Sequence, residues 1–278
     1  MDFSLPRGID RLPRHRGRLV AACRVAVDEA DVIGMAIAGS FVDGSPDTYS
    51  DLDLRVVLAN GSIERFFPRR EEFARACGPL VAAFTGEHVG EPQLLITLYD
   101  DLVHVDYLFT ELADAPDKNE GRKVQVLWQR DPEVSEALSR PYVTDPAADL
   151  AYVEARMWTW GWYIQSKILR GELWEAVSGL DSVRDSVLFR LLALSQENRY
   201  RGARFAEEAV GEHAAAIART LGTLDKESLL EALRTTVRLY LELADPLLER
   251  HEVEPARPAR QTVLSALEAG LSWQPSKA

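Results

Sequence analysis

The chain has little of what several common kinds of functional site require. Among its 278 residues there are two cysteines, Cys23 and Cys77, and five histidines. The cysteines form no Cys-x-x-Cys pair and the histidines no His-x-x-x-His pair, so neither a zinc site nor a disulfide framework is indicated. No stretch approaches the roughly 18 to 20 apolar residues that a membrane-spanning helix needs. We therefore predict a cytoplasmic protein that has no membrane partner.

Positive charge is also scarce. The sequence carries 44 acidic and 32 basic side chains, which gives a formal net charge of −12. Because phosphate neutralisation supplies most of the non-specific affinity for DNA and RNA, a chain this acidic is a poor candidate for nucleic-acid binding. It suits a cationic small molecule better. The hydrophobic content of 46% is typical of a globular protein, and the length allows one large domain or two ordinary ones.

The stretch 32–58 carries the strongest chemical signal. Residues 32–37 form a short apolar run of strand type, and from residue 51 polar side chains alternate with leucine and valine at the period of a second strand. Residues two apart in a strand project to the same side, so Asp51 and Asp53 share one face. Two carboxylates held side by side repel unless a cation lies between them, and hard oxygen ligands suit Mg²⁺.

Gly39 and Ser40 precede these carboxylates by about ten residues. Glycine tolerates the close approach of a ligand to the backbone, and the serine offers a hydroxyl donor, which together suit a phosphate. Turn residues at 43–47 make the spacer before Asp51 a loop. The sequence therefore predicts a site for a nucleotide and a metal ion. The alternative is a simple Gly-Ser turn before a strand whose exposed face happens to be acidic.

A third acidic residue lies in another predicted strand, 102–109. Its period of two places His104, Asp106 and Leu108 on one face. A carboxylate among apolar neighbours is costly to bury unless something compensates its charge. The alternative is an Asp106 that faces water from an edge strand. Other predicted elements of this half are helices at 16–31 and 63–77 and strands at 94–99 and 124–128.

Gly39-Ser40, the spacer and Asp51-x-Asp53 together resemble the motif of the polymerase-β-like nucleotidyltransferase superfamily, above all the antibiotic nucleotidyltransferases that act on aminoglycosides and lincosamides. The resemblance implies a mixed sheet, Mg²⁺ bound by the carboxylates and transfer of a nucleoside monophosphate to a hydroxyl. It implies that Gly39 and Ser40 hold the β- and γ-phosphates of ATP or another nucleoside triphosphate. It gives Asp106 the place of a third carboxylate, as metal ligand or as base.

The composition changes around residues 139–149, where Arg140-Pro141 and Asp145-Pro146 interrupt periodic structure. Strand-like runs are absent beyond this point. We therefore predict an α+β protein with a nucleotidyltransferase domain at 1–143 and an all-helical, substrate-binding domain at 144–278. The predicted helices of the second domain lie at 149–170, 180–196, 200–221, 225–250 and 259–270.

One stripe of the first of these helices mixes cations with aromatic side chains, at the helical spacings of four, three, four and three. The members of the stripe are Arg156, Trp160, Tyr163, Lys167 and Arg170. Such a stripe suits either a nucleotide, whose triphosphate needs positive charge opposite the metal, or a ring-bearing acceptor. The alternative is that the aromatic residues belong to the core and that the cations interact favourably with the C-terminal end of the helix.

The segment that begins at Lys167 and continues as Arg-Gly-Glu-Leu-Trp-Glu-Ala at 170–176 resembles the helical domain of the lincosamide and related enzymes. That resemblance implies that the helical domain supplies half of the cleft, with Lys167 as a nucleotide-binding residue. One departure is that strand 94–99 carries no acid, whereas some aminoglycoside enzymes place their general base there. Glu87, Glu91 and Glu154 are then further candidates for the base.

These observations predict Mg²⁺-dependent transfer of AMP or another nucleoside monophosphate to a hydroxyl of a small molecule, with release of pyrophosphate. An aminoglycoside or lincosamide antibiotic is the predicted acceptor, and such a protein would confer antibiotic resistance. Two alternatives are open: transfer to a protein hydroxyl, and a nucleotide-binding scaffold without turnover. A homodimer is also compatible with the resembled enzymes.

Overall fold

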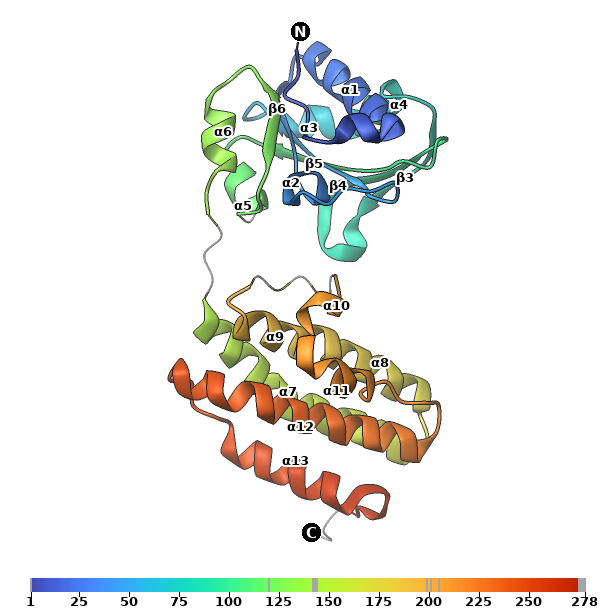
Figure 1. The fold of residues 1–278 in the computed structure, drawn as a ribbon, viewed down its shortest axis with the longest axis vertical. Coiled ribbons are helices and arrows are strands. Elements are labelled where there is room, and N and C mark those ends of the chain that lie inside the picture. The colour runs from blue at the N-terminus through green and yellow to red at the C-terminus, as the bar shows by residue number, and fades with distance from the viewer. Residues whose placement is uncertain are drawn as a thin grey trace. The chain divides into compact units, whose positions relative to one another are not determined.

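The computed structural model describes residues 2–119, 121–141, 145–198, 200, 202–204 and 206–274. The chain divides into two compact units, Met1–Val143 and Thr144–Ala278. The first unit contains a six-stranded sheet, whereas the described elements of the second are helical (Figure 1). The predicted α+β class, with a mixed-sheet domain followed by a helical domain, is confirmed. The functions assigned to the two domains stay predictions.

The sheet of the first unit has the strand order β3-β4-β5-β2-β1-β6. The central pair, β2 and β5, is parallel, and the other neighbouring strands pair in antiparallel fashion. Parallel pairing requires a long crossover, which the intervening helices and the β3–β4 hairpin provide. The strands are β1 (Val32–Ile37), β2 (Leu52–Leu58), β3 (Leu80–Gly86), β4 (Glu91–Tyr99), β5 (His104–Glu111) and β6 (Gln125–Gln129).

Helices pack on both faces of this sheet (Figure 1). On one face α1 and α4 join the strands in a core that contains Leu52, Leu54, Val105 and Tyr107, all fully buried. On the other face α5 and α6 pack on β1 and β2 around Ala36. The helices are α1 (Pro13–Asp28), α2 (Ser40–Asp43), α3 (Ile63–Phe66), α4 (Arg70–Ala76), α5 (Ala115–Asn119) and α6 (Glu133–Leu138).

Two features of the first unit differ from the sequence-based prediction. The helix expected at 63–77 is broken into α3 and α4 by a 3₁₀ turn at Phe67–Arg69. Pro68 explains the break, because proline lacks the N–H that a continuous α-helix would use. Strand β3 was not predicted: its sequence has no alternation of polar and apolar residues, the signal that identifies a half-buried strand.

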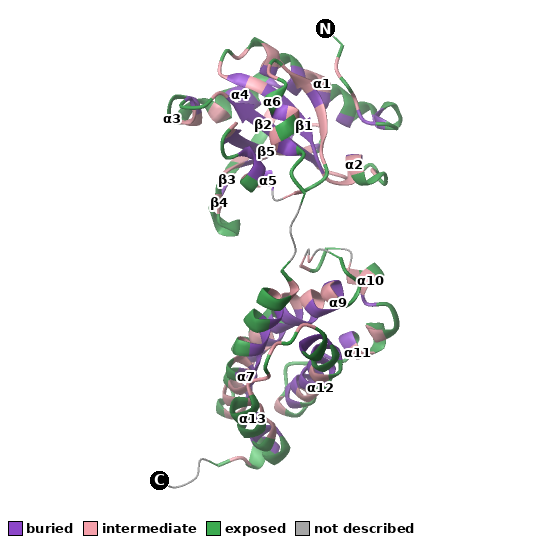
Figure 2. Cartoon of the chain, turned by 90° about the vertical axis from the view of Figure 1, so that its left-hand side faces the viewer, coloured by how far each residue is buried: buried purple, intermediate pink, exposed green. Residues whose placement is uncertain are grey.

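The second unit is built around α7, against which α8, α12 and α13 pack. Figure 2 shows buried residues along α7 and α12. Asp145 and Asp225 cap the two longest helices, since each accepts a hydrogen bond from a backbone N–H three residues later. The helices are α7 (Pro146–Arg170), α8 (Leu173–Val183), α9 (Arg190–Ser195), α10 (Ala206–Ala209), α11 (Ala214–Ala218), α12 (Lys226–Arg250) and α13 (Arg257–Ala269).

The prediction of a single helix at 200–221 is wrong. The described part of this segment contains only the short helices α10 and α11, joined by a 3₁₀ turn at Gly211–His213. Residues 201 and 205 lie outside the described residues. The helix predicted at 180–196 is continuous but changes its winding, with a π-helical stretch at Arg184–Phe189 between α8 and α9. In the described part of the chain, no helix has the length and apolar character needed to cross a membrane.

Candidate active site

The two central strands bring three carboxylates together. Asp53 on β2 is the direct register partner of Asp106 on β5, and Asp51 immediately precedes β2. One carboxylate oxygen from each residue lies within 4.8 Å of the others. We call Asp51, Asp53 and Asp106 the carboxylate cluster. Because β5 lies between β4 and β2, the alternative of an Asp106 exposed on an edge strand is wrong.

The alternation of both strands explains why the cluster forms. Leu52 and Leu54 point into the core beneath α1, so Asp53 between them points to the opposite face. The same holds on β5, where Val105 and Tyr107 are buried on either side of Asp106. Asp53 retains an exposed fraction of only 8%. Three anions in such a partly buried place favour a cation between them.

Gly39 fits closely against this cluster. It follows β1 and precedes the short helix α2, with φ 67° and ψ −149°, a conformation open to glycine and costly for other residues. A Cβ atom at this position would lie 2.1 Å from Asp53 Oδ2. The turn is tied to β2 by a hydrogen bond of 2.9 Å from Ala38 N–H to the Asp53 carbonyl oxygen. The absence of a side chain at Gly39 therefore leaves room for the Asp53 carboxylate.

The next residue supplies a hydroxyl that the protein itself does not use. Ser40 Oγ is buried and has no hydrogen-bond partner among the described residues. An unpaired buried polar group is costly, and such groups in native proteins call for an explanation such as a bound ligand. A phosphate oxygen would accept the hydrogen bond that this hydroxyl can donate. The structure thus fits the predicted role of Ser40 and leaves it to be tested.

A histidine that the sequence analysis assigned no role adjoins the cluster. His104 Nε2 lies 3.0 Å from Asp106 Oδ1. The contact with the Asp106 carboxylate raises the pKa of His104, partial burial lowers it, and the charges of Asp51 and Asp53 raise it further. The signal was present in the sequence, because His104 and Asp106 are two residues apart on one strand.

The donor set of the cluster fits the predicted metal. Three carboxylates provide hard oxygen ligands without nitrogen or sulfur, which is the chemistry that Mg²⁺ prefers. Gly39, which packs against the Asp53 carboxylate, and the unused Ser40 hydroxyl are consecutive residues next to the cluster. A metal-bound phosphate group fits this combination of ligands and donors.

Lys167 lies on α7 in the second unit, and its surroundings in that unit are defined. Its ammonium is 2.6 Å from Glu172 Oε2 and 5.0 Å from the centre of the Tyr163 ring. The hydrogen bond to Glu172 raises the pKa of Lys167. Tyr163 in turn donates a hydrogen bond of 2.7 Å to Glu175. The role of Lys167 in binding a nucleotide stays a prediction.

The rest of the stripe on α7 divides between core and surface. Trp160 packs against the hydrophobic core of the second unit, as the structural alternative predicted. Tyr163 has 44% of its surface exposed. Arg156 stacks on the ring of Tyr152, with 3.7 Å from the guanidinium carbon to the ring centre.

The three glutamates considered as bases have different surroundings. Glu154 has an exposed fraction of 3% and accepts hydrogen bonds from the Trp158 indole, the Tyr240 hydroxyl and the Ala256 N–H. These contacts join α7 to α12 and to the start of α13, so Glu154 has a structural function. Glu91 forms an ion pair of 2.8 Å with Lys118. Glu87 is exposed at the end of the β3–β4 hairpin, where it accepts a hydrogen bond from Thr85.

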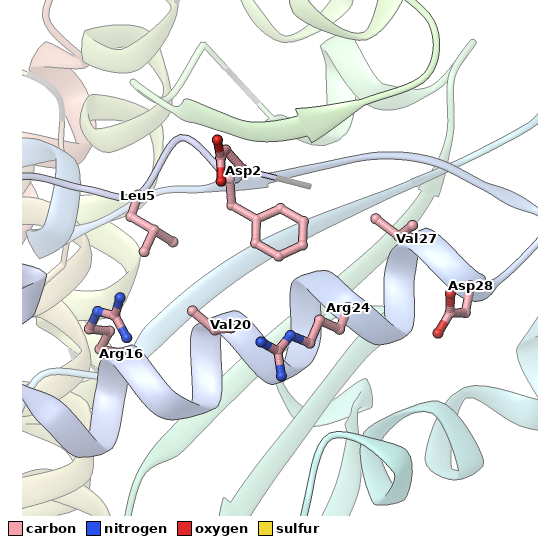
Figure 3. A pocket seen from close by; sticks show the side chains of 8 residues that line it. Asp2, Leu5, Arg16, Val20, Arg24, Val27 and Asp28 are labelled. Carbon is pink, nitrogen blue, oxygen red and sulfur yellow. The ribbon is translucent and has the colours of Figure 1, made fainter.

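Two cavities lie away from the cluster. One, of about 590 Å³, is lined by the N-terminal segment and by α1, including Leu5, Val20 and Arg24 (Figure 3). Since α1 covers the other face of the sheet, this cavity is separated from the carboxylates by the core. The second, of about 440 Å³, is in the helical unit between α7 and α13 and is lined by three tryptophans. Neither cavity contains a predicted site residue.

Comparisons with known proteins give similarities of structure only. No family model and no curated protein sequence matches the chain. Among solved structures, the chain is similar to an aminoglycoside 6-adenyltransferase from Bacillus subtilis, with a TM-score of 0.44 and 14% identity over 93% of this chain and 99% of that one. It is also similar to a nucleotidyltransferase-like protein from Exiguobacterium sibiricum 255-15, with a TM-score of 0.39 and 12% identity over 92% and 88% of the two chains.

A third similar structure is a STING-associated CdnE c-di-GMP synthase from Capnocytophaga granulosa. Its TM-score is 0.29, with 14% identity over 84% of this chain and 81% of that one. At these sequence identities, a reaction and its substrates can be proposed only from the residues of this chain.

Proposed function

We propose that the protein is a nucleotidyltransferase that transfers a nucleoside monophosphate, AMP from ATP in the first instance, to a hydroxyl group of a small molecule. The acceptor oxygen bonds to the α-phosphorus as the bond from that phosphorus to the bridging oxygen breaks, and pyrophosphate leaves. The observation that carries the proposal is the carboxylate cluster beside Gly39 and the unused Ser40 hydroxyl.

The residues of the cluster have separable tasks in this proposal. Asp51 and Asp53 hold Mg²⁺, and Asp106 completes the set of ligands or takes the proton of the acceptor hydroxyl. When bound, Mg²⁺ would neutralise charge on the phosphates and orient them. Gly39 and Ser40 bind the β- and γ-phosphates through the backbone and the hydroxyl. His104 Nε2 lies 3.0 Å from one oxygen of Asp106, which leaves the other oxygen for the metal or for the proton of the acceptor.

The acceptor that the sequence resemblance favours is an aminoglycoside or lincosamide antibiotic. The acidic character of the chain supports attraction of a cationic acceptor. In this proposal the helical unit contributes to substrate binding, and Lys167 supplies positive charge for the departing pyrophosphate.

The test is to incubate the full chain with Mg²⁺, ATP labelled at the α-phosphate and a panel of both antibiotic classes. The proposal predicts a labelled antibiotic and one pyrophosphate per transfer, both lost in Asp53→Asn. Label on a protein would instead indicate a protein hydroxyl as acceptor. Binding of ATP without release of pyrophosphate, with every acceptor tested, would indicate a scaffold without turnover.

A further inference from the structure

The face of the sheet that carries the carboxylates continues onto β4 and β3 as an apolar surface. Residues paired directly on neighbouring strands point to the same face. Asp53 pairs with Asp106, Asp106 with Ile96 on β4, and Ile96 with Phe84 on β3. These four side chains therefore form one row across four strands, half carboxylate and half apolar.

The neighbouring rows extend the apolar half. Leu98 pairs with His104 and with Ala82, and Leu94 pairs with Leu108. We call the residues of β3 and β4 on this side the apolar face; they are Ala82, Phe84, Leu94, Ile96 and Leu98. The alternate β4 residues point into the core, where Leu95, Thr97 and Tyr99 have exposed fractions of 3% or less.

Within the first unit, the other elements leave the apolar face accessible. Phe84 has 54% of its surface exposed, and Leu94, Ile96 and Leu98 are each half-buried. The helices on this side of the sheet, α5 and α6, pack over β1 and β2, and α5 also contacts β5 and, through Lys118, Glu91 at the end of β4. At its outer end, the ring of His88 lies 5.8 Å from that of Phe84.

The position of the apolar face relative to the phosphate-binding residues indicates what it binds. Gly39 and Ser40 follow β1, on one side of the cluster, whereas β4 and β3 lie on the other side, beyond Asp106. With phosphates on the β1 side, the reacting hydroxyl approaches from the Asp106 side. Its molecular body then lies over β4 and β3.

The residues of the apolar face itself offer no charge partner to a strongly charged body. In the segment 80–99 the acidic residues are Glu87 and Glu91, both at the end of the hairpin, and Glu91 is paired with Lys118. A polycationic sugar would have to be desolvated on leucine, isoleucine and phenylalanine without carboxylates opposite its ammonium groups, which is unfavourable. An apolar or aromatic group would gain by burial there.

We propose that the apolar face binds the body of the hydroxyl acceptor, and that the acceptor is therefore an alcohol joined to an apolar or aromatic group and not a polycationic sugar. This inference rests on the proposed nucleotidyltransferase function and refines its acceptor. Of the two antibiotic classes above, it excludes the polycationic aminoglycosides, although the net charge of −12 would attract them, and keeps acceptors that have a hydrophobic part next to the reacting hydroxyl.

The test uses ligand-observed saturation-transfer NMR on the full chain with Mg²⁺ and a non-hydrolysable ATP analogue. The probes are phenyl β-D-glucoside, methyl β-D-glucoside and the aminoglycoside kanamycin. We expect saturation of the phenyl protons and little on the methyl glucoside or kanamycin. In Phe84→Ser and Ile96→Ser, affinity for the phenyl probe should fall by roughly tenfold, the factor expected for one aromatic contact. Leu221→Ser, which alters an exposed leucine of the helical unit, should not change it.

The adenine protons of the ATP analogue distinguish a failure of the acceptor inference from a failure of the proposed function. Adenine saturation that depends on Mg²⁺, without saturation of the phenyl protons, would overturn the acceptor inference and leave the nucleotide site standing. Absence of adenine saturation would instead reject the proposed function. A loss of the adenine signal in Phe84→Ser would show that the apolar face binds the base of the nucleotide. A fall in the melting temperature of Phe84→Ser, together with no phenyl signal in the wild type, would show that the apolar face is covered by the protein itself. Either result would overturn the inference.

Discussion

Gly39 packs so closely against the Asp53 carboxylate that residue 39 can carry no side chain. A Cβ at residue 39 would lie 2.1 Å from Asp53 Oδ2, well inside van der Waals distance. The glycine therefore has two functions: it adopts a backbone conformation with φ 67°, and it leaves room for a carboxylate of the cluster. The predicted phosphate-binding turn and the predicted metal site thus depend on each other.

Gly39→Ala should consequently impair both stability and metal binding. Backbone strain alone should lower the free energy of unfolding by about 1–3 kcal/mol, and displacement of Asp53 should weaken Mg²⁺ binding. Gly44→Ala is the matched control, because Gly44 has φ 96° but its Cβ would meet nothing within 4 Å. Denaturant unfolding and metal titration of both variants check this expectation. Equal metal affinity in the two variants would show that the Gly39–Asp53 contact is not needed.

Ser40→Ala should weaken triphosphate binding without harming the fold. The hydroxyl is buried without a partner among the described residues, so its removal should leave the melting temperature unchanged or raise it. A hydrogen bond to a charged group is worth roughly 1.5–3 kcal/mol, which corresponds to about a ten- to hundredfold loss of ATP affinity. AMP, which lacks the β- and γ-phosphates, should bind both proteins alike. Calorimetric titration with each nucleotide distinguishes this role from simple support of the loop.

Lys167→Ala should lower kcat more than it weakens acceptor binding, if its ammonium opposes the charge of the departing pyrophosphate. Within its own unit Lys167 forms an ion pair with Glu172. The effect of breaking this ion pair must therefore be distinguished from the effect of removing the positive charge. Glu172→Gln breaks the same ion pair and keeps the lysine. Steady-state kinetics and melting temperatures of both variants decide the question. If the two variants melt and turn over alike, Lys167 is only a partner of Glu172.

Glu154→Ala should destabilise the helical unit and leave the chemistry intact. It removes a buried carboxylate that accepts three hydrogen bonds and lies 3.6 Å from Arg260. Breaking a buried charge pair costs about 3 kcal/mol or more. Pyrophosphate release per folded molecule should equal that of the wild type. A variant that folds normally but loses turnover would restore Glu154 as a candidate base.

The sequence was sufficient to predict strands 32–37 and 52–58, because alternation and turn residues are local signals. It also placed Asp51 and Asp53 on one face. The pairing of Asp53 with Asp106 could not be derived from spacing, since it depends on β2 and β5 being parallel neighbours after a crossover of about 45 residues. The resemblance supplied that relationship before the structure did.

Other features depend on tertiary context that no local pattern contains. Strand β3 is an apolar run without alternation, and it is stabilised by pairing with β4. The row from Asp53 to Phe84 likewise follows from the register of four strands. The segment 200–221 does not form one helix because Gly202 and Gly211 both adopt positive φ in the structure, a conformation outside the α-helical range.

The carboxylate cluster should repel itself when no cation is bound. Asp51→Asn and Asp53→Asn should therefore raise the melting temperature in the presence of a chelator, because each removes one of three mutually repelling charges and leaves the contact between His104 and Asp106 in place. Added Mg²⁺ should stabilise the wild type and have little effect on either variant. Differential scanning calorimetry with and without Mg²⁺ measures both effects. Stabilisation of all three proteins to the same extent would place the cation elsewhere.

The central claim is that this cluster binds a divalent cation together with a nucleotide, and titration with Mn²⁺ tests it most directly. Free Mn²⁺ can be followed by electron paramagnetic resonance in the presence of a non-hydrolysable ATP analogue. The account predicts saturable binding by the wild type and a large loss of affinity in Asp51→Asn and Asp53→Asn. This loss should exceed the roughly 10- to 100-fold effect of altering a residue outside the ligand set. Mn²⁺ binding of equal affinity in the wild type and both variants would contradict it.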